Sequence, residues 1–223
     1  MAKIPQTTFI PDRTAYLSKL CAGRSVLHLG FADAIHYDAA LEEGRHLHAE
    51  LKKVTPPNLI YGVDISDDRV RHFQDLWHDD NLIVGDVEKL EKLPLDQKFD
   101  VIVAGELIEH LNNPGLMLDG VRRFMRDDSR LVITTPNALG LKFQLHALAG
   151  NDRSHWDHCV MFSFSTLSTL LRRHHLEPQT WYTAIETFAG TRNQMTRPIL
   201  ERLFKFRPQL PETLIVESAI SRK

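Results

Sequence analysis

Two carboxylates and an imidazole lie close together in the segment GELIEHL, residues 105–111. If this segment is helical, Glu106, Glu109 and His110 occupy positions i, i+3 and i+4 and share one face. Such a face could bind a divalent metal through oxygen and nitrogen ligands. Without a metal, His110 could act as a base or contact a substrate, and all three residues could also serve only to pack and hydrogen-bond. These interpretations stay open, and we favour a metal-free histidine that takes part in the chemistry.

Short apolar runs elsewhere in the chain also end in glycine or in an acidic residue. Gly30 ends the run SVLHLG, Asp64 lies in YGVDIS, and Asp86 lies in NLIVGDVE. Apolar runs of strand length with polar ends are typical of parallel strands that are buried on both faces. Ligands bind at the carboxyl edge of open α/β sheets, so the three residues outline a pocket for an adenosine-containing cofactor.

The hydrophobic pattern predicts the elements that position these residues. Apolar runs of strand length occupy 25–30, 59–63, 82–84, 101–104 and 131–134, and two late strands are expected at 180–185 and 214–218. Helical spacing or helix-start residues mark 13–21, 37–51, 67–77, 138–149 and the segment after Asn113-Pro114. Because the first five strands alternate with helices, the pattern predicts an α/β fold. Residues 1–12 contain Pro5 and Pro11 and are expected to be an irregular arm.

The bulk properties favour a single cytoplasmic domain. A chain of 223 residues is long enough for one full-sized domain, which we place at 1–223. The net charge of -2 provides no general attraction to nucleic acid or acidic membranes. Cys21 and Cys159 lie far apart and form no disulfide framework, as expected for reduced thiols. No stretch reaches the roughly 18 apolar residues that indicate a membrane span. The sequence does not indicate the oligomeric state.

Five motifs in order carry a resemblance to a known family. They are VLHLGFADA, YGVDIS, GDVEKL, FDVIVAGELIEHL and LVITTPNA. Together they resemble the class I S-adenosylmethionine-dependent methyltransferases, over roughly residues 20 to 220. The resemblance implies a Rossmann-like, seven-stranded, mostly parallel sheet with helices on both faces and the last strand antiparallel beside the fifth. It also implies an enzyme that uses S-adenosylmethionine and methylates a small biosynthetic molecule, for which we favour an oxygen acceptor.

By this resemblance, seven residues form the cofactor site. They are Gly30, Phe31, Asp64, Ile65, Asp86, Val87 and Gly105. The turn at Gly30 would hold the methionine part of the cofactor, Asp64 would bind the ribose above Ile65, and Asp86 would contact the adenine. Each position also has a simpler interpretation: an ordinary turn at Gly30, a turn-forming Asp64 and a helix cap at Asp86.

The first motif departs from the family pattern. The usual loop has three alternating glycines, with an acidic residue two places before the first. This chain has His28 at the acidic position and Ala32 and Ala34 at two glycine positions. The change removes a partner for the ammonium group of the cofactor, although Asp33 could compensate or could merely cap the next helix. A non-catalytic binding protein of the same fold is therefore one alternative function.

The segments 138–162 and 190–212 are expected to face the acceptor. His155 and His158 lie in the first segment, where Trp156, Phe162 and Phe164 could line an apolar pocket or anchor a surface loop. The basic residues between 192 and 207 could contact phosphates, although a solvated helix explains them better. The resemblance makes His110, Glu106 and His158 the catalytic candidates.

A divalent metal is the less favoured alternative for the same residues. Ubiquinone-pathway O-methyltransferases and small-RNA 2′-O-methyltransferases carry a similar Glu-x-x-Glu-His segment and bind a metal there. The corresponding metal candidates are Glu106, Glu109, His110 and His158. A metal-dependent RNA 2′-O-methyltransferase is therefore a second alternative function, against which the acidic net charge argues.

Overall fold

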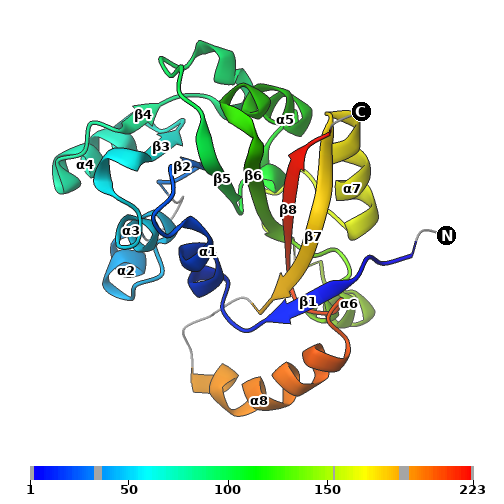
Figure 1. Cartoon of the computed structure of the whole chain (residues 1–223). Helices are drawn as coiled ribbons and strands as arrows, with labels where there is room; N and C mark the ends of the chain where they lie inside the picture. Colours follow the sequence, from blue (N-terminus) through cyan, green and yellow to red (C-terminus); the bar gives the residue numbers. More distant parts are fainter. Residues whose placement is uncertain (1–2, 33–36, 153, 186–190, 222–223) are drawn as a thin grey trace.

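A central sheet in the order β1-β7-β8-β6-β5-β2-β3-β4 organises the computed structural model (Figure 1). The structure describes residues 3–32, 37–152, 154–185 and 191–221. Its strands are β1 (Thr7–Ile10), β2 (Val26–Leu29), β3 (Ile60–Asp64), β4 (Leu82–Val84), β5 (Phe99–Gly105), β6 (Met125–Pro136), β7 (Leu176–Ala184) and β8 (Thr213–Ile220). All neighbouring pairs of this sheet are parallel except β8 with β6 and β8 with β7. The predicted α/β architecture is confirmed, and β8 lies antiparallel beside β6, which corresponds to the fifth of the predicted strands.

The helices lie on both faces of the sheet (Figure 1). They are α1 (Arg13–Cys21), α2 (Tyr37–Glu42), α3 (Leu47–Lys52), α4 (Asp67–Trp77), α5 (Pro114–Val121), α6 (Leu141–Leu148), α7 (Phe164–Arg173) and α8 (Thr191–Phe206). Four 3₁₀ turns add η1 (Pro57–Leu59), η2 (Val87–Lys92), η3 (Ile108–His110) and η4 (Arg122–Phe124). Within the described ranges, no helix combines the length and the apolar character that crossing a bilayer requires.

The two faces of the sheet belong to two separate hydrophobic clusters. Side chains alternate along a strand, so Ile102 of β5 packs with α5 and α7 in one cluster. Its neighbour Val103 packs with α1 and α3 in the other cluster. Both residues are fully buried. The central strands are therefore buried on both faces, as their continuous apolar runs predict.

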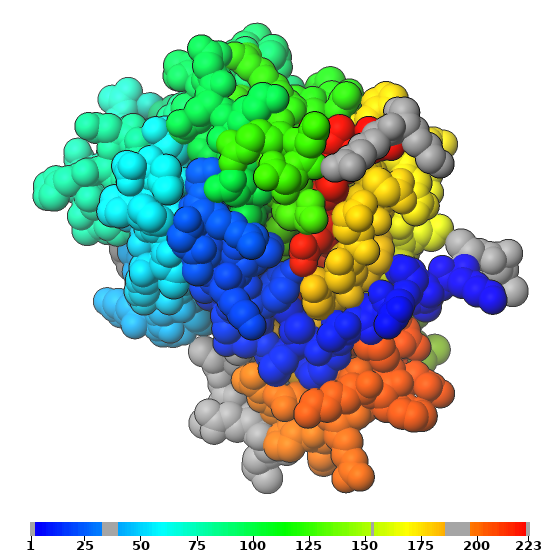
Figure 2. All heavy atoms as spheres, in the orientation of Figure 1, coloured from blue at the N-terminus to red at the C-terminus, as the bar shows by residue number. Residues whose placement is uncertain are grey.

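Within the described ranges the sheet has eight strands rather than the expected seven, because the N-terminal arm contributes β1. Residues Thr7 to Ile10 pair in parallel with β7, from Thr7 opposite Trp181 to Ile10 opposite Ala184. The prediction of an irregular arm over 1–12 is wrong for this segment. Pro5 and Pro11 lie outside the strand, and an edge strand tolerates proline at its ends. Figure 2 shows this N-terminal strand against α8, where the ring centroids of Phe9 and Phe204 are 5.7 Å apart.

The helix predicted over 37–51 is in fact two helices. Gly44 adopts a φ of 64° between them, a left-handed conformation that an α-helix does not contain. The imidazole of His46 then accepts a hydrogen bond from the backbone N–H of Ala49 at 3.3 Å and caps α3. The expectations for Asp33 and Ala34 lie outside the described residues.

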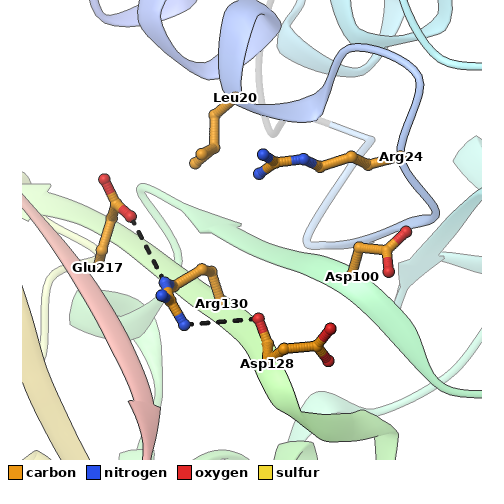
Figure 3. Close-up of a pocket in the computed structure, with 6 residues that line it drawn as sticks. All are labelled: Leu20, Arg24, Asp100, Asp128, Arg130 and Glu217. Atoms are coloured by element: carbon orange, nitrogen blue, oxygen red, sulfur yellow. Dashed lines mark hydrogen bonds and ion pairs between the residues drawn. The ribbon is translucent and has the colours of Figure 1, made fainter.

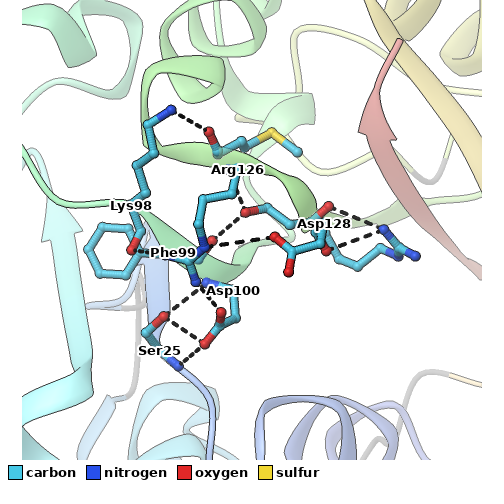
Figure 4. Close-up of polar contacts among 9 residues, drawn as sticks. Ser25, Lys98, Phe99, Asp100, Arg126 and Asp128 are labelled. Carbon is cyan, nitrogen blue, oxygen red and sulfur yellow. Dashed lines mark hydrogen bonds and ion pairs between the residues drawn. The ribbon is translucent and has the colours of Figure 1, made fainter. Parts of the chain in front are cut away.

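A polar network at the amino ends of the strands ties β2 to β5 and β6 (Figure 4). The backbone N–H and the hydroxyl of Ser25 each donate to Asp100 Oδ2 at 2.8 Å. Arg126 also pairs with Asp100 and donates to the carbonyl of Lys98 at 2.9 Å. Burial acts to raise the pKa of Asp100, but the hydrogen bonds from Ser25 and Arg126 outweigh it and lower that pKa. The network holds the start of β6, which begins at Met125 rather than at the predicted residue 131.

Candidate active site at the carboxyl edge of the sheet

Three residues expected at the cofactor site meet where β2, β3 and β5 end. Leu29 pairs with Val63 on one side and with Ala104 on the other. The next residues, Gly30, Asp64 and Gly105, therefore lie side by side at the carboxyl edge. Gly30 has a φ of 70°, and a Cβ there would lie 2.9 Å from Leu107 Cδ1. The left-handed backbone conformation favours glycine at this position, and a larger residue would also have to displace the side chain of Leu107.

Asp64 connects the turns that follow β2 and β3. Its side chain is 8% exposed, and its two oxygens accept from the backbone N–H of Ala32 at 3.1 Å and of Ser66 at 2.9 Å. A carboxylate has about four acceptor sites, so these bonds leave capacity for a ligand. The neighbouring Ile65 is 69% exposed and offers an apolar surface beside Asp64. The turn-forming role of Asp64 is thus real and compatible with ligand binding.

Asp86 and Phe31 have clear structural roles. Asp86 caps η2 through a 2.9 Å bond from the backbone N–H of Glu88, and it pairs with Lys89 at 2.7 Å. The hydrogen bond from Lys89 lowers the pKa of Asp86. Phe31 is 2% exposed and packs with Phe73, so its backbone rather than its ring is left for contact with a cofactor. Val87 is also buried.

The position two residues before Gly30 carries no charge. His28 is 2% exposed, and its Nδ1 lies 3.2 Å from Nδ1 of His48, with the two rings stacked. Burial lowers the pKa of His28 to about 3, and the positive charges of His46 and Arg13 act in the same direction. Burial also lowers the pKa of His48. A neutral histidine pair therefore replaces the acidic residue that the family pattern has at this position.

The GELIEHL segment is not the helix that its spacing suggests. Only Ile108–His110 forms a 3₁₀ turn, and Glu106 precedes it with a φ of 49°. The backbone N–H of Glu106 still donates to the carbonyl of Thr134 at 2.9 Å, so Glu106 extends the pairing of β5 with β6. The prediction that Glu106 shares a helical face with Glu109 and His110 is therefore wrong.

Three of the four metal candidates nevertheless come together, and we call them the Glu–His cluster: Glu109, His110 and His158. One ligand atom from each lies within 4.8 Å of the others. Glu109 is fully buried, and its Oε2 accepts from the hydroxyl of Thr135 at 2.9 Å. Among the described residues, neither Oε1 of Glu109 nor the buried Nδ1 of His158 has a hydrogen-bond partner.

Burial determines the charge of this cluster. It raises the pKa of Glu109 well above its usual range, and the nearby carboxylate of Glu106 raises it further. Burial likewise lowers the pKa of His158, as do the adjacent imidazoles of His110 and His155. The cluster therefore favours a protonated Glu109 and a neutral His158. Such perturbed groups in one place are typical of functional sites.

Asp157 orients His110, a role that the sequence did not suggest. Nδ1 of His110 lies 3.1 Å from both the backbone carbonyl and Oδ2 of Asp157. The backbone N–H of Cys159 donates to the carbonyl of Glu109 at 2.8 Å and holds this loop against η3. Because Nδ1 donates to Asp157, Nε2 of His110 is the nitrogen left to accept a proton.

Arg13 is a second residue that the sequence analysis missed at this edge. From the start of α1, its guanidinium pairs with Glu106 Oε1 at 2.8 Å and donates to the hydroxyl of Thr134 at 3.1 Å. The Thr134 hydroxyl in turn donates to Glu106 Oε1 at 2.8 Å. Since more than 90 residues separate Arg13 from Glu106 along the chain, no local motif connects the two.

The expected aromatic lining of an acceptor pocket is only partly formed. Phe162 and Phe164 are 3% and 2% exposed and belong to the main hydrophobic cluster, whereas Trp156 is 80% exposed. Of the two interpretations left open for these aromatic residues, Phe162 and Phe164 fit the role of anchors, because their rings fill the core under α7. The segments after β6 and β7, which contain α6 and α8, both leave from the carboxyl edge.

A cavity of about 490 Å³ lies at the opposite, amino edge of the sheet (Figure 3). Its lining residues are Leu20, Arg24, Asp100, Asp128, Arg130 and Glu217. Arg130 pairs there with Glu217 at 4.0 Å and donates to the carbonyl of Asp128 at 3.4 Å. Since ligands of open α/β sheets bind at the carboxyl edge, we do not place the active site in this cavity.

Comparison with known proteins places the fold among methyltransferases. Residues 11–180 match the model of a family described as a methyltransferase domain. A SAM-dependent methyltransferase from Archaeoglobus fulgidus has 19% identity and a TM-score of 0.55, with 92% of this chain and 90% of that chain covered. No curated protein matches the sequence significantly.

Two further structural relatives contain the demethylated cofactor product. Magnesium protoporphyrin IX methyltransferase from Synechocystis PCC 6803, with bound SAH, has 15% identity and a TM-score of 0.55, with 93% and 80% of the two chains covered. The Burkholderia thailandensis 1,6-didemethyltoxoflavin-N1-methyltransferase, with bound S-adenosylhomocysteine, has 15% identity and a TM-score of 0.51, with 93% and 76% covered. At these identities the likeness is one of fold.

Proposed function

Because the chain belongs to the methyltransferase domain family, we propose that it transfers a methyl group from S-adenosylmethionine to an oxygen atom of a small-molecule acceptor. The observation that carries the proposal is that Gly30, Asp64 and Gly105 meet at one edge of the sheet. Glu109 of the Glu–His cluster follows Gly105 by only four residues. A cofactor-binding edge and a group of perturbed acids and bases are thus combined at one place.

The cofactor would lie across the ends of β2, β3 and β5. Asp64 would accept hydrogen bonds from the ribose hydroxyls, and the exposed side chain of Ile65 would pack under the adenine. Asp86 and the backbone of Val87 would contact the edge of the adenine. The absence of a side chain at Gly30 lets the methionine portion approach the backbone closely. The two relatives with bound S-adenosylhomocysteine support this choice of cofactor.

His110 is the best candidate for the base in methyl transfer. S-adenosylmethionine, when bound, supplies a methyl group that its sulfonium already activates. Holding an acceptor in line with that group can contribute about 7–11 kcal/mol in favourable cases. Nε2 of His110 would take the proton of the acceptor hydroxyl while the hydroxyl oxygen bonds to the methyl carbon. The bond between that carbon and the sulfonium sulfur would break, and S-adenosylhomocysteine would leave. Base catalysis of this kind contributes about 10²–10⁴-fold. Asp157 would keep His110 in the required tautomer, as its contact with Nδ1 allows.

A metal-dependent enzyme is a second candidate, favoured by one specific observation. Oε1 of Glu109 and Nδ1 of His158 are buried and lack partners among the described residues. Together with His110, these atoms form an oxygen and nitrogen ligand set that suits a borderline divalent cation. The three residues would hold such an ion near the acceptor. An RNA 2′-hydroxyl is the corresponding alternative acceptor, and the net charge of -2 argues against it.

Two measurements test the proposal. Calorimetry with S-adenosylhomocysteine should show binding to the wild-type protein, strongly weakened by Asp64→Asn and unchanged by Asp67→Asn, a nearby acidic residue on the surface of α4. No binding to the wild type would leave only a non-catalytic protein of this fold. Methyl transfer to a panel of hydroxylated acceptors, with and without a chelator, then separates the two mechanisms. Activity that resists the chelator supports His110 as the base, and activity restored only by added metal supports the second candidate.

A further inference from the structure

The amino-acid end of the proposed cofactor presents two opposite charges to this carboxyl edge. Its ammonium and its carboxylate both lose water on binding and need partners, because an unpaired buried charge is very costly. His28 cannot supply a negative charge, since it is 2% exposed and bonded to His48. Its low pKa keeps it neutral throughout the physiological range. The charges must therefore be met by other residues.

Arg13 and Glu106 lie in the same part of the carboxyl edge as the histidine pair. A Cβ on Gly105 would be 4.0 Å from Nε2 of His28 and 3.8 Å from the hydroxyl of Thr134. That hydroxyl is the one that bonds Glu106 and Arg13. Burial lowers the pKa of His28 and raises that of Glu109, and in both cases the positive charge of Arg13 acts to lower the pKa. The guanidinium therefore lies close to both the end of β2 and the Glu–His cluster.

We propose that Arg13 and Glu106 form a clamp for the zwitterionic amino-acid portion of the methyl donor, in which Glu106 receives the ammonium and Arg13 receives the carboxylate. This inference rests on the proposed function. It assigns the role of the missing acidic residue on β2 to a carboxylate at the end of β5. It also gives the N-terminal helix α1 a direct part in cofactor recognition.

The state of the two side chains suits such a clamp. Arg13 and Glu106 are 27% and 32% exposed, so a ligand can reach both. A partly exposed ion pair contributes little to stability, and it can open to admit two further charges at small cost. The hydroxyl of Thr134 and the backbone pairing of Glu106 keep its carboxylate in place. Glu106 holds a φ of 49°, an unfavourable conformation that non-glycine residues keep mainly where their position matters.

Calorimetry with two ligands tests the clamp. S-adenosylhomocysteine contains the amino-acid portion, whereas 5′-methylthioadenosine has the same adenosine and thioether but lacks it. We expect Arg13→Gln and Glu106→Gln each to weaken S-adenosylhomocysteine about 10- to 100-fold, the range for one charged hydrogen bond. Both variants should bind 5′-methylthioadenosine as the wild type does. Arg172→Gln, which opens the remote pair with Glu177, should change neither ligand.

Each outcome separates the clamp from the proposed function. If the wild type binds both ligands and both variants keep wild-type affinity for S-adenosylhomocysteine, the clamp is wrong and the proposed function stands. If the variants lose affinity for both ligands equally, the pair only supports the fold, which also contradicts the clamp. If the wild type binds neither ligand, the proposed function fails and the clamp fails with it.

Discussion

Acidification should destabilise this protein through its buried histidine pair, and Gln at position 28 should reduce that effect. The pKa of His28 is about 3 in the folded chain, against an ordinary value of 6.5. Its contribution to stability is therefore complete above pH 6.5 and is lost as the pH falls from 6.5 toward 3, because the unfolded chain binds a proton that the folded chain does not. Each pH unit below 6.5 costs about 1.4 kcal/mol.

Between pH 7 and pH 5, this amounts to about 2 kcal/mol for His28, since about 1.5 pH units of the interval lie below the unfolded pKa. His48, whose pKa is also lowered by burial, acts in the same direction. Glu109 acts oppositely, because its raised pKa makes the folded chain lose stability as the pH rises. Glu109 is present in both the wild type and His28→Gln, so its contribution cancels when the two proteins are compared.

Urea unfolding followed by circular dichroism at pH 5, 6 and 7 measures this effect. The wild type should lose about 2 kcal/mol more of its free energy of unfolding than His28→Gln between pH 7 and pH 5. Gln can still hydrogen-bond to His48, so the pair remains buried. His78→Asn is the matched control, because His78 is exposed and Asn tolerates its φ of 48°. Equal losses in the wild type and His28→Gln would mean that His28 accepts a proton in the folded chain, which would contradict a neutral residue at position 28 of β2.

Two further changes probe the edge of the sheet. Asp157→Asn should lower kcat about tenfold, because Asn weakens the orientation of His110 while the backbone carbonyl of residue 157 still contacts it; tenfold is near the low end of the effect of base catalysis. Affinity for S-adenosylhomocysteine, measured by calorimetry, should not change. An unchanged kcat would show that Asp157 has no part in the mechanism. Gly30→Ala should lower the free energy of unfolding by about 1–2 kcal/mol because of the left-handed φ alone, and contact between the new Cβ and Leu107 should lower it further. A thermal melt that matches the wild type would contradict both effects.

The sequence predicts which residues meet at the carboxyl edge of the sheet, because the geometry there follows from chain order. Parallel strands in adjacent positions bring their carboxyl ends together, so residues after apolar runs must meet. Gly30, Asp64 and Gly105 lie side by side for this reason. No side-chain contact is needed to place them, and a pattern of apolar runs contains all the information that the prediction uses.

The Glu–His cluster and its surroundings depend on contacts that no local sequence pattern encodes. The spacing of Glu106, Glu109 and His110 fits a helix, but Glu106 continues the pairing of β5 with β6 and leaves only one 3₁₀ turn. Asp157 reaches His110 across 47 residues of chain. The strand β1 could not be predicted from local sequence either. Its four residues lie between Pro5 and Pro11, and they form a strand only because β7 offers an unpaired edge.

The unusual first motif is compatible with cofactor binding because its remaining glycine stands where glycine is required. Gly30 combines a φ of 70° with a position where a Cβ would have to displace the side chain of Leu107. Ala32 needs no such freedom: its backbone N–H bonds to Asp64, and its side chain is fully buried beside Phe31. Its methyl group therefore points into the core rather than toward a ligand. The alanine at position 32 adds to the packing under the loop, and it gives no reason to infer that this carboxyl edge has lost its ligand.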